Sequence, residues 1–216
     1  MPRSPRLASP RARSGQARAW SSLRLKDRIR PGVRVLFVGI NPGVRSAQTG
    51  HHFAGYSNRF WKLLWESGLL PEPVTFEHDG RLTEFGFGIT NLIARPSPGI
   101  DDLAPSEYIE GWGVLERKIR RYRPRVVALV GVTLFRAIEP LIAADADRVP
   151  RITKARTLHL GLQSATIHGA KVFVLPNPSG RNANFSYAEM LAAFRSLRLA
   201  INARPQRRAR SGGASA

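Results

Sequence analysis

Cysteine is absent from this chain of 216 residues. Without it there can be no disulfide, thiolate nucleophile, cysteine-held zinc or iron–sulfur cluster. Long apolar runs are also missing, since the longest (126–132 and 35–40) fall far short of the ~20 residues that a membrane-spanning helix needs. Acidic residues are scarce, with 15 Asp and Glu against 34 Lys and Arg and a formal net charge of +19. We therefore expect a soluble intracellular domain that makes no membrane contact.

The positive charge is concentrated at the two ends of the chain. Residues 1–34 hold ten basic residues and one acidic residue, and residues 198–216 hold five basic residues and no acidic residue. Both segments are rich in Pro, Ser, Ala and Gly, a composition that does not bury a core. We predict a basic disordered arm over 1–32, one folded domain over 33–200, and a basic disordered tail over 201–216.

Three interpretations of these basic ends remain open. Arginine side chains on flexible arms can lie along a polyphosphate backbone and release its counterions. Arginine also supplies 29 of the 34 basic residues, so a composition bias explains the ends equally well. An Arg- and Ser-rich N-terminus is also typical of transit peptides, although Pro2, Pro5 and Pro10 disfavour the helix that such peptides form.

Apolar runs and amphipathic segments alternate along the middle of the chain. The pattern predicts strands at 33–39, 87–93 and 125–132, and a hairpin over 165–175. It predicts helices that begin near 58, over 105–122, through 134–138, and after a capping box from Ser186 to Glu189. Trp61 and Trp65 lie four residues apart on one predicted helix, where we expect both in the core. Such alternation predicts an α/β fold with a mainly parallel sheet covered by helices on both faces.

Two Asn-Pro loops directly follow predicted strands. One is Gly39-Ile40-Asn41-Pro42-Gly43, and the other is Asn177-Pro178-Ser179-Gly180. Ligands of such sheets bind outside the carboxyl ends of the strands. We therefore expect the two loops to meet at one edge of the sheet and to form the functional site there.

Five motifs, in order, resemble those of the mismatch-specific uracil/thymine DNA glycosylases of the uracil-DNA glycosylase superfamily. Besides the two Asn-Pro loops they are Thr49-Gly50-His51-His52-Phe53, Asn58-Arg59-Phe60-Trp61-Lys62, and Gly88-Ile89-Thr90-Asn91-Leu92 with Arg95. The resemblance covers roughly residues 33–199 and implies a three-layer α/β/α domain. It implies an enzyme that flips a mismatched or damaged base out of double-stranded DNA and hydrolyses its N-glycosidic bond, which starts base excision repair.

The resemblance also implies that no metal and no organic cofactor is needed. Adjacent side chains such as His51 and His52 diverge, so a two-histidine metal site is not expected. We expect a monomer in the cytoplasm, associated with the nucleoid if the source is bacterial, with an organelle or the nucleus left open.

The resemblance assigns roles to individual residues. Asn41 takes the place of the residue that holds the attacking water, a task that an amide can perform by hydrogen bonds although it cannot remove a proton. Phe53 takes the place of the aromatic ring that stacks on the flipped base. The implied base pocket comprises Ile40, His52, Phe53, Asn91 and Asn177.

Each of these residues also has an ordinary structural interpretation. Asn41 suits a turn, because Asn-Pro-Gly is common turn chemistry. Phe53 suits a core, His52 a solvated loop, and Asn91 the cap of a strand end.

The implied DNA contacts are Arg59, Ser179, Gly180, Arg181 and Asn182. Arg181 stands where the family has an apolar wedge that fills the gap left by the flipped base. A guanidinium there can fill the gap and bond to the orphaned guanine, or it can contact phosphate alone. Both alternatives remain open at this point.

Two other functions remain as alternatives. The altered wedge loop and the basic ends also suit a catalytically idle nucleic-acid-binding protein that keeps the fold. A nucleotide-binding α/β hydrolase is a weaker alternative, because the chain has neither a P-loop nor a dinucleotide-binding glycine motif.

Overall fold

A five-stranded sheet forms the centre of the computed structural model, which describes residues 19–145 and 160–203. The strands are β1 (Val35–Gly39), β2 (Phe87–Asn91), β3 (Val126–Val130), β4 (Gly161–Ile167) and β5 (Ala170–Leu175). The helices are α2 (Val44–Thr49), α3 (Phe60–Glu66), α4 (Pro105–Tyr122), α5 (Val132–Asp145) and α6 (Tyr187–Asn202), with 3₁₀ segments η1 (Phe76–Phe85) and η2 (Ile100–Asp102). No helix within the described ranges is long and apolar enough to cross a bilayer.

The strands follow the order β2-β1-β3-β5-β4 across the sheet. The first four are parallel to one another, and β4 runs antiparallel to β5 as the second arm of a hairpin. β1 and β3 are buried at every position, which explains why their sequences are continuous apolar runs. The carboxyl ends of β1, β2, β3 and β5 therefore lie at one edge of the sheet, as the sequence predicts.

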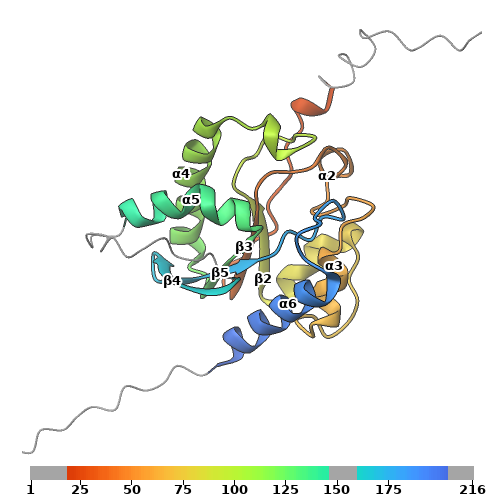
Figure 1. Cartoon of the computed structure of the whole chain (residues 1–216), viewed down its shortest axis with the longest axis vertical. Helices are drawn as coiled ribbons and strands as arrows, with labels where there is room; N and C mark the ends of the chain where they lie inside the picture. The colour runs from red at the N-terminus through yellow and green to blue at the C-terminus, as the bar shows by residue number, and fades with distance from the viewer. Residues whose placement is uncertain (1–18, 146–159, 204–216) are drawn as a thin grey trace, which may run out of the picture.

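Helices cover both faces of the sheet and make three layers, with α3 and α6 on one face and α4 and α5 on the other (Figure 1). On the first face, Phe60 of α3 packs against Phe37 of β1 and against Phe194 of α6. On the second face, Leu115 of α4 and Leu134 of α5 pack around Leu36 of β1. The predicted α/β/α class with a mainly parallel sheet is confirmed.

The elements agree closely with the sequence pattern, with two exceptions. The Ser186 hydroxyl caps α6 by accepting a hydrogen bond from the Glu189 backbone N–H, as the capping box predicts. The prediction that Trp65 lies in the core is wrong, because Trp65 is 46% exposed whereas Trp61 is buried. α3 is only seven residues long, so its buried stripe includes Phe60, Trp61, Leu63 and Leu64 and leaves the next position outside. The short helix α2 and the 3₁₀ segment η1 have no counterpart in the predicted elements.

The folded part of the chain begins upstream of the predicted boundary at residue 33. Arg28 pairs with Ile89 of β2 through two backbone hydrogen bonds. The Asp27 carboxylate accepts a hydrogen bond from the Thr90 hydroxyl and forms an ion pair with Lys118 of α4. Residues 26–30 thus belong to the domain. The remainder of the predicted arm up to residue 18, and the predicted tail from residue 204, lie outside the described residues.

Candidate active site

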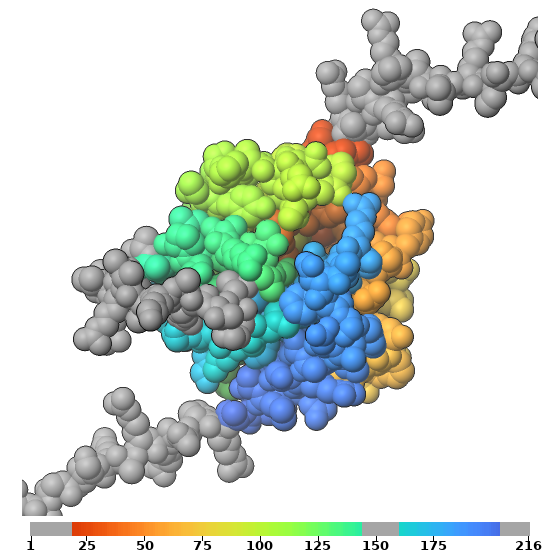
Figure 2. Space-filling model, viewed as in Figure 1, coloured from red at the N-terminus to blue at the C-terminus, as the bar shows by residue number. Residues whose placement is uncertain are grey.

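A cavity of about 690 Å³ opens at the carboxyl ends of the strands. It is lined by the loop that follows β1, the loop that follows β2, the segment between α2 and α3, and the loop that follows β5. In the space-filling view, the orange residues of the first loops lie between the yellow-green segment after β2 and the blue loop after β5 (Figure 2). The two Asn-Pro loops therefore meet, as the sequence predicts.

The Asn41 amide is held in one orientation at the wall of this cavity. Its Nδ2 donates to the Arg95 carbonyl at 3.1 Å, to the Pro42 carbonyl at 3.2 Å and to the Ser97 Oγ at 2.8 Å. Carbonyl oxygens only accept hydrogen bonds, so the nitrogen must face them. No described residue donates to Asn41 Oδ1. The half-buried side chain therefore offers the cavity an acceptor, the group that a water molecule can donate to.

Ser97 fixes this orientation and was not anticipated from the sequence. Its buried hydroxyl donates to the Gly99 carbonyl at 2.5 Å and accepts from Asn41 Nδ2. A backbone bridge between Gly43 and Ser97 joins the loops after β1 and β2. The Arg-Pro-Ser-Pro stretch gives no indication of this role, because Asn41, which Ser97 contacts, lies 56 residues away in the chain.

The Phe53 ring stacks on Phe60, with ring centroids 4.0 Å apart and an interplanar angle of 21°. Phe60 covers one face of the ring, so the other face is the one that can receive a flat ligand in the cavity that Phe53 lines. Phe53 has φ of +53°, a conformation that bulky residues rarely adopt. The unusual backbone turns this side chain back toward the end of β1.

Phe53 and Asn91 meet above Gly39. A Cβ atom built on Gly39 would lie 2.6 Å from Asn91 Oδ1 and 3.5 Å from Phe53 Cζ. A glycine is therefore required at this position for the amide and the ring to approach the backbone. Ile40 also lines the cavity, although its side chain belongs to the core, so its backbone is the part that faces the site.

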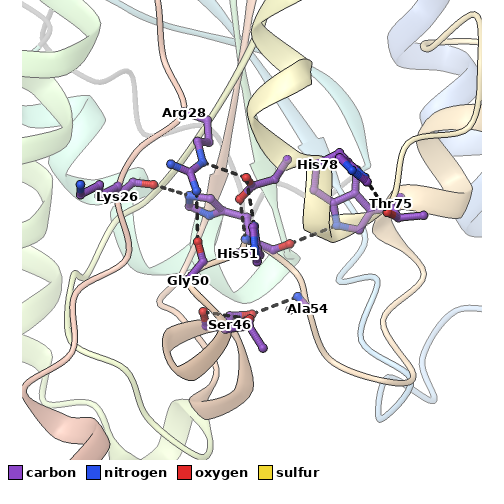
Figure 3. Close-up of polar contacts among 12 residues, drawn as sticks. Lys26, Arg28, Ser46, Gly50, His51, Ala54, Thr75 and His78 are labelled. Atoms are coloured by element: carbon purple, nitrogen blue, oxygen red, sulfur yellow. Dashed lines mark hydrogen bonds and ion pairs between the residues drawn. The ribbon is translucent and has the colours of Figure 1, made fainter.

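A buried carboxylate anchors the segment that carries Phe53. Asp79 accepts hydrogen bonds from Arg28 Nε at 2.8 Å and from the His52 backbone N–H at 3.0 Å, and it lies 3.3 Å from His51 Nδ1. Arg28 also donates to the Gly50 carbonyl, and the Ser46 hydroxyl accepts from the Ala54 N–H (Figure 3). These contacts hold both ends of the segment 50–54.

His52 lines the cavity but is buried, with 1% of its surface exposed. Its Nε2 lies 3.1 Å from the Lys26 carbonyl, so in the neutral ring this nitrogen carries the proton. Desolvation lowers the pKa of His52 to about 4, and hydrogen bonding to Lys26 only partly opposes that shift. His52 is thus a neutral residue of the interior, and the interpretation as a solvated loop histidine is wrong. Its backbone carbonyl accepts from the Trp61 indole N–H.

The loop after β5 is ordered by its own asparagines. Asn177 Oδ1 accepts from the Ser179 N–H, and Asn182 Nδ2 donates to the Asn177 carbonyl. Gly180 packs on Ser57, where an added Cβ would lie 2.4 Å from the Ser57 Cβ. The Arg59 backbone N–H donates to the Pro178 carbonyl at 3.0 Å and joins the start of α3 to the same loop.

Two arginines lie at the mouth of the cavity. Arg181 is exposed. Its Nη1 donates to the Pro98 carbonyl at 3.4 Å, and this bond links the loop after β5 to the loop after β2. The guanidinium of Arg45 lies 3.6 Å from the ring centroid of Tyr56, which is 90% exposed. Arg45 Nε also donates to the Ala54 carbonyl. Neither Arg45 nor Tyr56 was predicted as a site residue, since an isolated exposed tyrosine carries no sequence signal.

The predicted site residues divide into two groups in space. Ile40, Asn41, His52, Phe53, Asn91, Asn177, Ser179 and Arg181 all line the cavity. Gly180, Asn182 and Arg59 support its rim through the contacts described above and do not line it. Within the described part of the chain, no three His, Asp or Glu side chains lie close enough to hold a metal ion.

Comparison with known proteins agrees with this arrangement. Residues 27–198 match the model of the uracil DNA glycosylase superfamily. The fold is similar to the solution NMR structure of a candidate uracil DNA glycosylase from Methanosarcina acetivorans, with a TM-score of 0.54 and 19% sequence identity. The match covers 82% of this chain and 98% of that one. The chain therefore belongs to the uracil DNA glycosylase superfamily.

Proposed function

We propose that this protein is a monofunctional DNA glycosylase that removes uracil from mismatched duplex DNA by hydrolysis, with thymine and related lesions as further candidate substrates. The orientation of the Asn41 amide is the observation that carries the proposal. Three acceptors hold Nδ2, so Oδ1 is the atom that a water molecule can donate to, in the cavity that Phe53 also lines.

The chemistry needs little more than this arrangement. Departure of the base leaves an oxocarbenium-like sugar, which is so electrophilic that the attacking water needs orientation more than deprotonation. An amide supplies the orientation, and the absence of a carboxylate at this position predicts a slow enzyme that favours bases which leave easily. The departing base carries negative charge, and the backbone N–H groups around Ile40 and Phe53 are the candidate donors to it.

The flipped base would stack on the free face of Phe53, beside the Asn91 amide. Stacking of a base on an aromatic ring contributes about 1–3 kcal/mol and tolerates different bases. Asn91 Oδ1 lies next to the backbone of Gly39, and this position supports a role for the amide in hydrogen bonding to the edge of a stacked base. At the mouth, the exposed Arg181 is the candidate to enter the gap in the duplex, and its side chain would give up its 3.4 Å bond to the Pro98 carbonyl to do so.

The full chain, incubated with a duplex that carries uracil opposite guanine, should produce alkali-labile sites, and the Asn41→Ala variant should lose nearly all of this activity. Single-turnover rates on uracil, thymine, hypoxanthine and ethenocytosine, each opposite all four bases, would define the substrate and the role of Arg181. A wild-type protein that is inert on G·U duplex, on single-stranded uracil DNA and on ethenocytosine would contradict the proposal. That outcome would favour an idle nucleic-acid-binding protein.

A further inference from the structure

The opposite end of the sheet carries a second concentration of charge. Arg34 precedes β1, Arg125 precedes β3, and Lys171 lies at the start of β5. The three are consecutive across the sheet, because the Arg125 N–H donates to the Arg34 carbonyl and the Lys171 N–H donates to the Arg125 carbonyl. All three residues are exposed. Neighbouring strands are about 4.8 Å apart, so the backbones of these cationic residues follow one another at that spacing.

The end of α4 adds two more cations to this edge. Arg120 and Arg123 line a cavity of about 560 Å³ together with Pro124, Arg125, His168 and Gly169. We call Arg34, Arg120, Arg123, Arg125 and Lys171 the basic edge. A position near a helix C-terminus is favourable for Arg120 and Arg123. A helix C-terminus does not account for Arg34, Arg125 and Lys171, which lie at the starts of strands.

Most of this charge is not neutralised within the domain. Arg120 forms an ion pair with Glu116, and Arg34 donates to the Phe85 carbonyl. Among the described residues, no carboxylate lies within ion-pair distance of Arg123, Arg125 or Lys171. Arg123 and Arg125, unpaired among the described residues, line the open cleft, and Lys171 adds a third cation at the same edge, on the face of the sheet to which its register partner Val126 points. An edge with these cations attracts anionic groups.

From this geometry we infer that the basic edge binds the phosphate backbone of a second DNA duplex while the first occupies the cavity at the carboxyl ends. The choice of duplex DNA rests on the proposed function, whereas the charge and the cleft do not. Arg34 and Asn41 lie at opposite ends of β1, roughly 20 Å apart at about 3.3 Å per residue. A straight duplex at the carboxyl ends of the strands cannot also lie along their amino ends.

The surface suits nucleic acid better than a protein partner. Protein interfaces are anchored by buried aromatic and aliphatic side chains. Of the large hydrophobic side chains that are exposed in the described part of the chain, none lines this cleft. Phosphate binding needs only cations, and each cation that contacts phosphate adds about 0.9 to the slope of log affinity against log salt.

The test is a ternary complex of the full chain with two duplexes. The cavity is first saturated with a short duplex that contains an abasic site, and a second intact duplex with a different fluorophore is then titrated in at several salt concentrations. The variant Arg125→Gln/Lys171→Gln should bind the second duplex at least about tenfold more weakly, with a salt slope lower by about 2. Its affinity for the first duplex and its excision rate on a short uracil duplex should not change.

The matched control is Arg136→Gln/Arg195→Gln, which removes the same charge from exposed positions on α5 and α6. Thermal unfolding of both variants checks that the fold is intact. Equal loss of second-duplex binding in the two variants would overturn the inference and assign the effect to net charge. Unchanged binding in both would overturn it too, and would assign the second duplex to other basic residues of the chain.

Poly-glutamate is the third arm of the experiment. If it occupies the basic edge more tightly than duplex does, the partner is an acidic protein segment and the inference fails. Failure of the proposed function looks different: the wild type would excise nothing from any substrate, yet the loss of second-duplex binding in Arg125→Gln/Lys171→Gln would still be measurable.

Discussion

At the carboxyl ends of the strands the central polar groups are neutral amides, whereas at the amino ends they are exposed cations. Asn41 is held in place by three hydrogen bonds, one of them to a buried serine, and Asn91 lies close to the backbone of Gly39. Arg125 and Lys171 are exposed and have no ion-pair partner in the described part of the chain.

The difference separates two kinds of recognition. A hydrogen-bonded amide acts at one position and loses its effect when it shifts by an ångström. An exposed cation acts over a Debye length of about 8–10 Å and weakens with salt. Changes at the cavity should therefore alter the rate of chemistry at any ionic strength. Changes at the basic edge should alter the affinity for the second duplex and its salt dependence, and leave the rate of chemistry unchanged.

The largest effect is expected for Asn41→Ala. Loss of the oriented acceptor should lower the single-turnover rate on a G·U duplex by about 10²–10³-fold, the range found when one preorganised polar group is removed from a reaction site. The salt dependence of duplex binding should stay as in the wild type. Asn41→Asp should not restore activity, because it places an oxygen against the Pro42 and Arg95 carbonyls. Full activity of the aspartate variant would show that this orientation is unimportant.

Gly39→Ala should come next, with a loss of about 10²-fold, because a 1 Å misplacement near the reacting centre costs about that much. The new methyl would lie 2.6 Å from Asn91 Oδ1 and would push the amide or the Phe53 ring away. Gly43→Ala is the matched control, since nothing lies within 4 Å of its added Cβ and its φ of −66° suits alanine. Equal rates for the two variants would remove Gly39 from the site.

The stability of the domain should fall as the pH decreases from about 6.5 to about 4. Burial lowers the folded-state pKa of His52 to about 4, so in this window the unfolded chain binds a proton that the folded chain does not. The loss contributed by His52 should reach about 3 kcal/mol at the low end. Urea unfolding at a series of pH values measures this loss of stability. A His52→Asn variant should show a flatter dependence of stability on pH. Parallel profiles would mean that His52 is not the titrating group.

Ser97→Ala should lower the single-turnover rate by about fivefold, because one hydrogen bond contributes about 1 kcal/mol and the Arg95 carbonyl still holds Nδ2. The change should act only through Asn41. In an Asn41→Ala background it should therefore have no further effect, and additive losses would indicate a separate role for the hydroxyl. The free energy of unfolding, measured for the wild type, the two single variants and the double variant, would show whether the fold is intact.

Truncation of the N-terminus should give the smallest effect on catalysis. Removal of residues 1–18 deletes five arginines and should lower the salt slope of duplex binding by no more than about 4.5, with single-turnover cleavage unchanged. Removal of residues 1–30 should also destabilise the domain, because it deletes the Arg28 ion pair with buried Asp79. An unchanged salt slope in the shorter truncation would favour a composition bias as the origin of these arginines.

The sequence predicts the sheet and the long helices because their signals are local. The apolar run of β3 and the capping box of α6 lie within a few residues of the elements that they define. The loops after β1 and β5 could be brought together by one topological rule. Trp65 was misassigned because a four-residue spacing cannot show where a short helix turns away from the core.

The supporting contacts of the site could not be read from the sequence in the same way. Asp79, Ser97 and Arg28 act on segments that lie 22 to 56 residues away in the chain. A lone Asp or Ser in a polar loop gives no indication of the amide that it will hold. The basic edge depends on register across the sheet, since Arg34, Arg125 and Lys171 become neighbours only when β1, β3 and β5 pair.

The close packing of Gly180 on Ser57 has a consequence for substrate choice. It joins the two rims of the mouth without space for adjustment, while the aromatic floor is already fixed by stacking on Phe60. A recess whose walls are packed this closely discriminates for or against a pyrimidine 5-methyl group by its dimensions. Such a difference of one carbon changes discrimination by about 1–3 kcal/mol. For the proposed glycosylase, the preference between uracil and thymine would then be set in the folded apoprotein, before any DNA arrives.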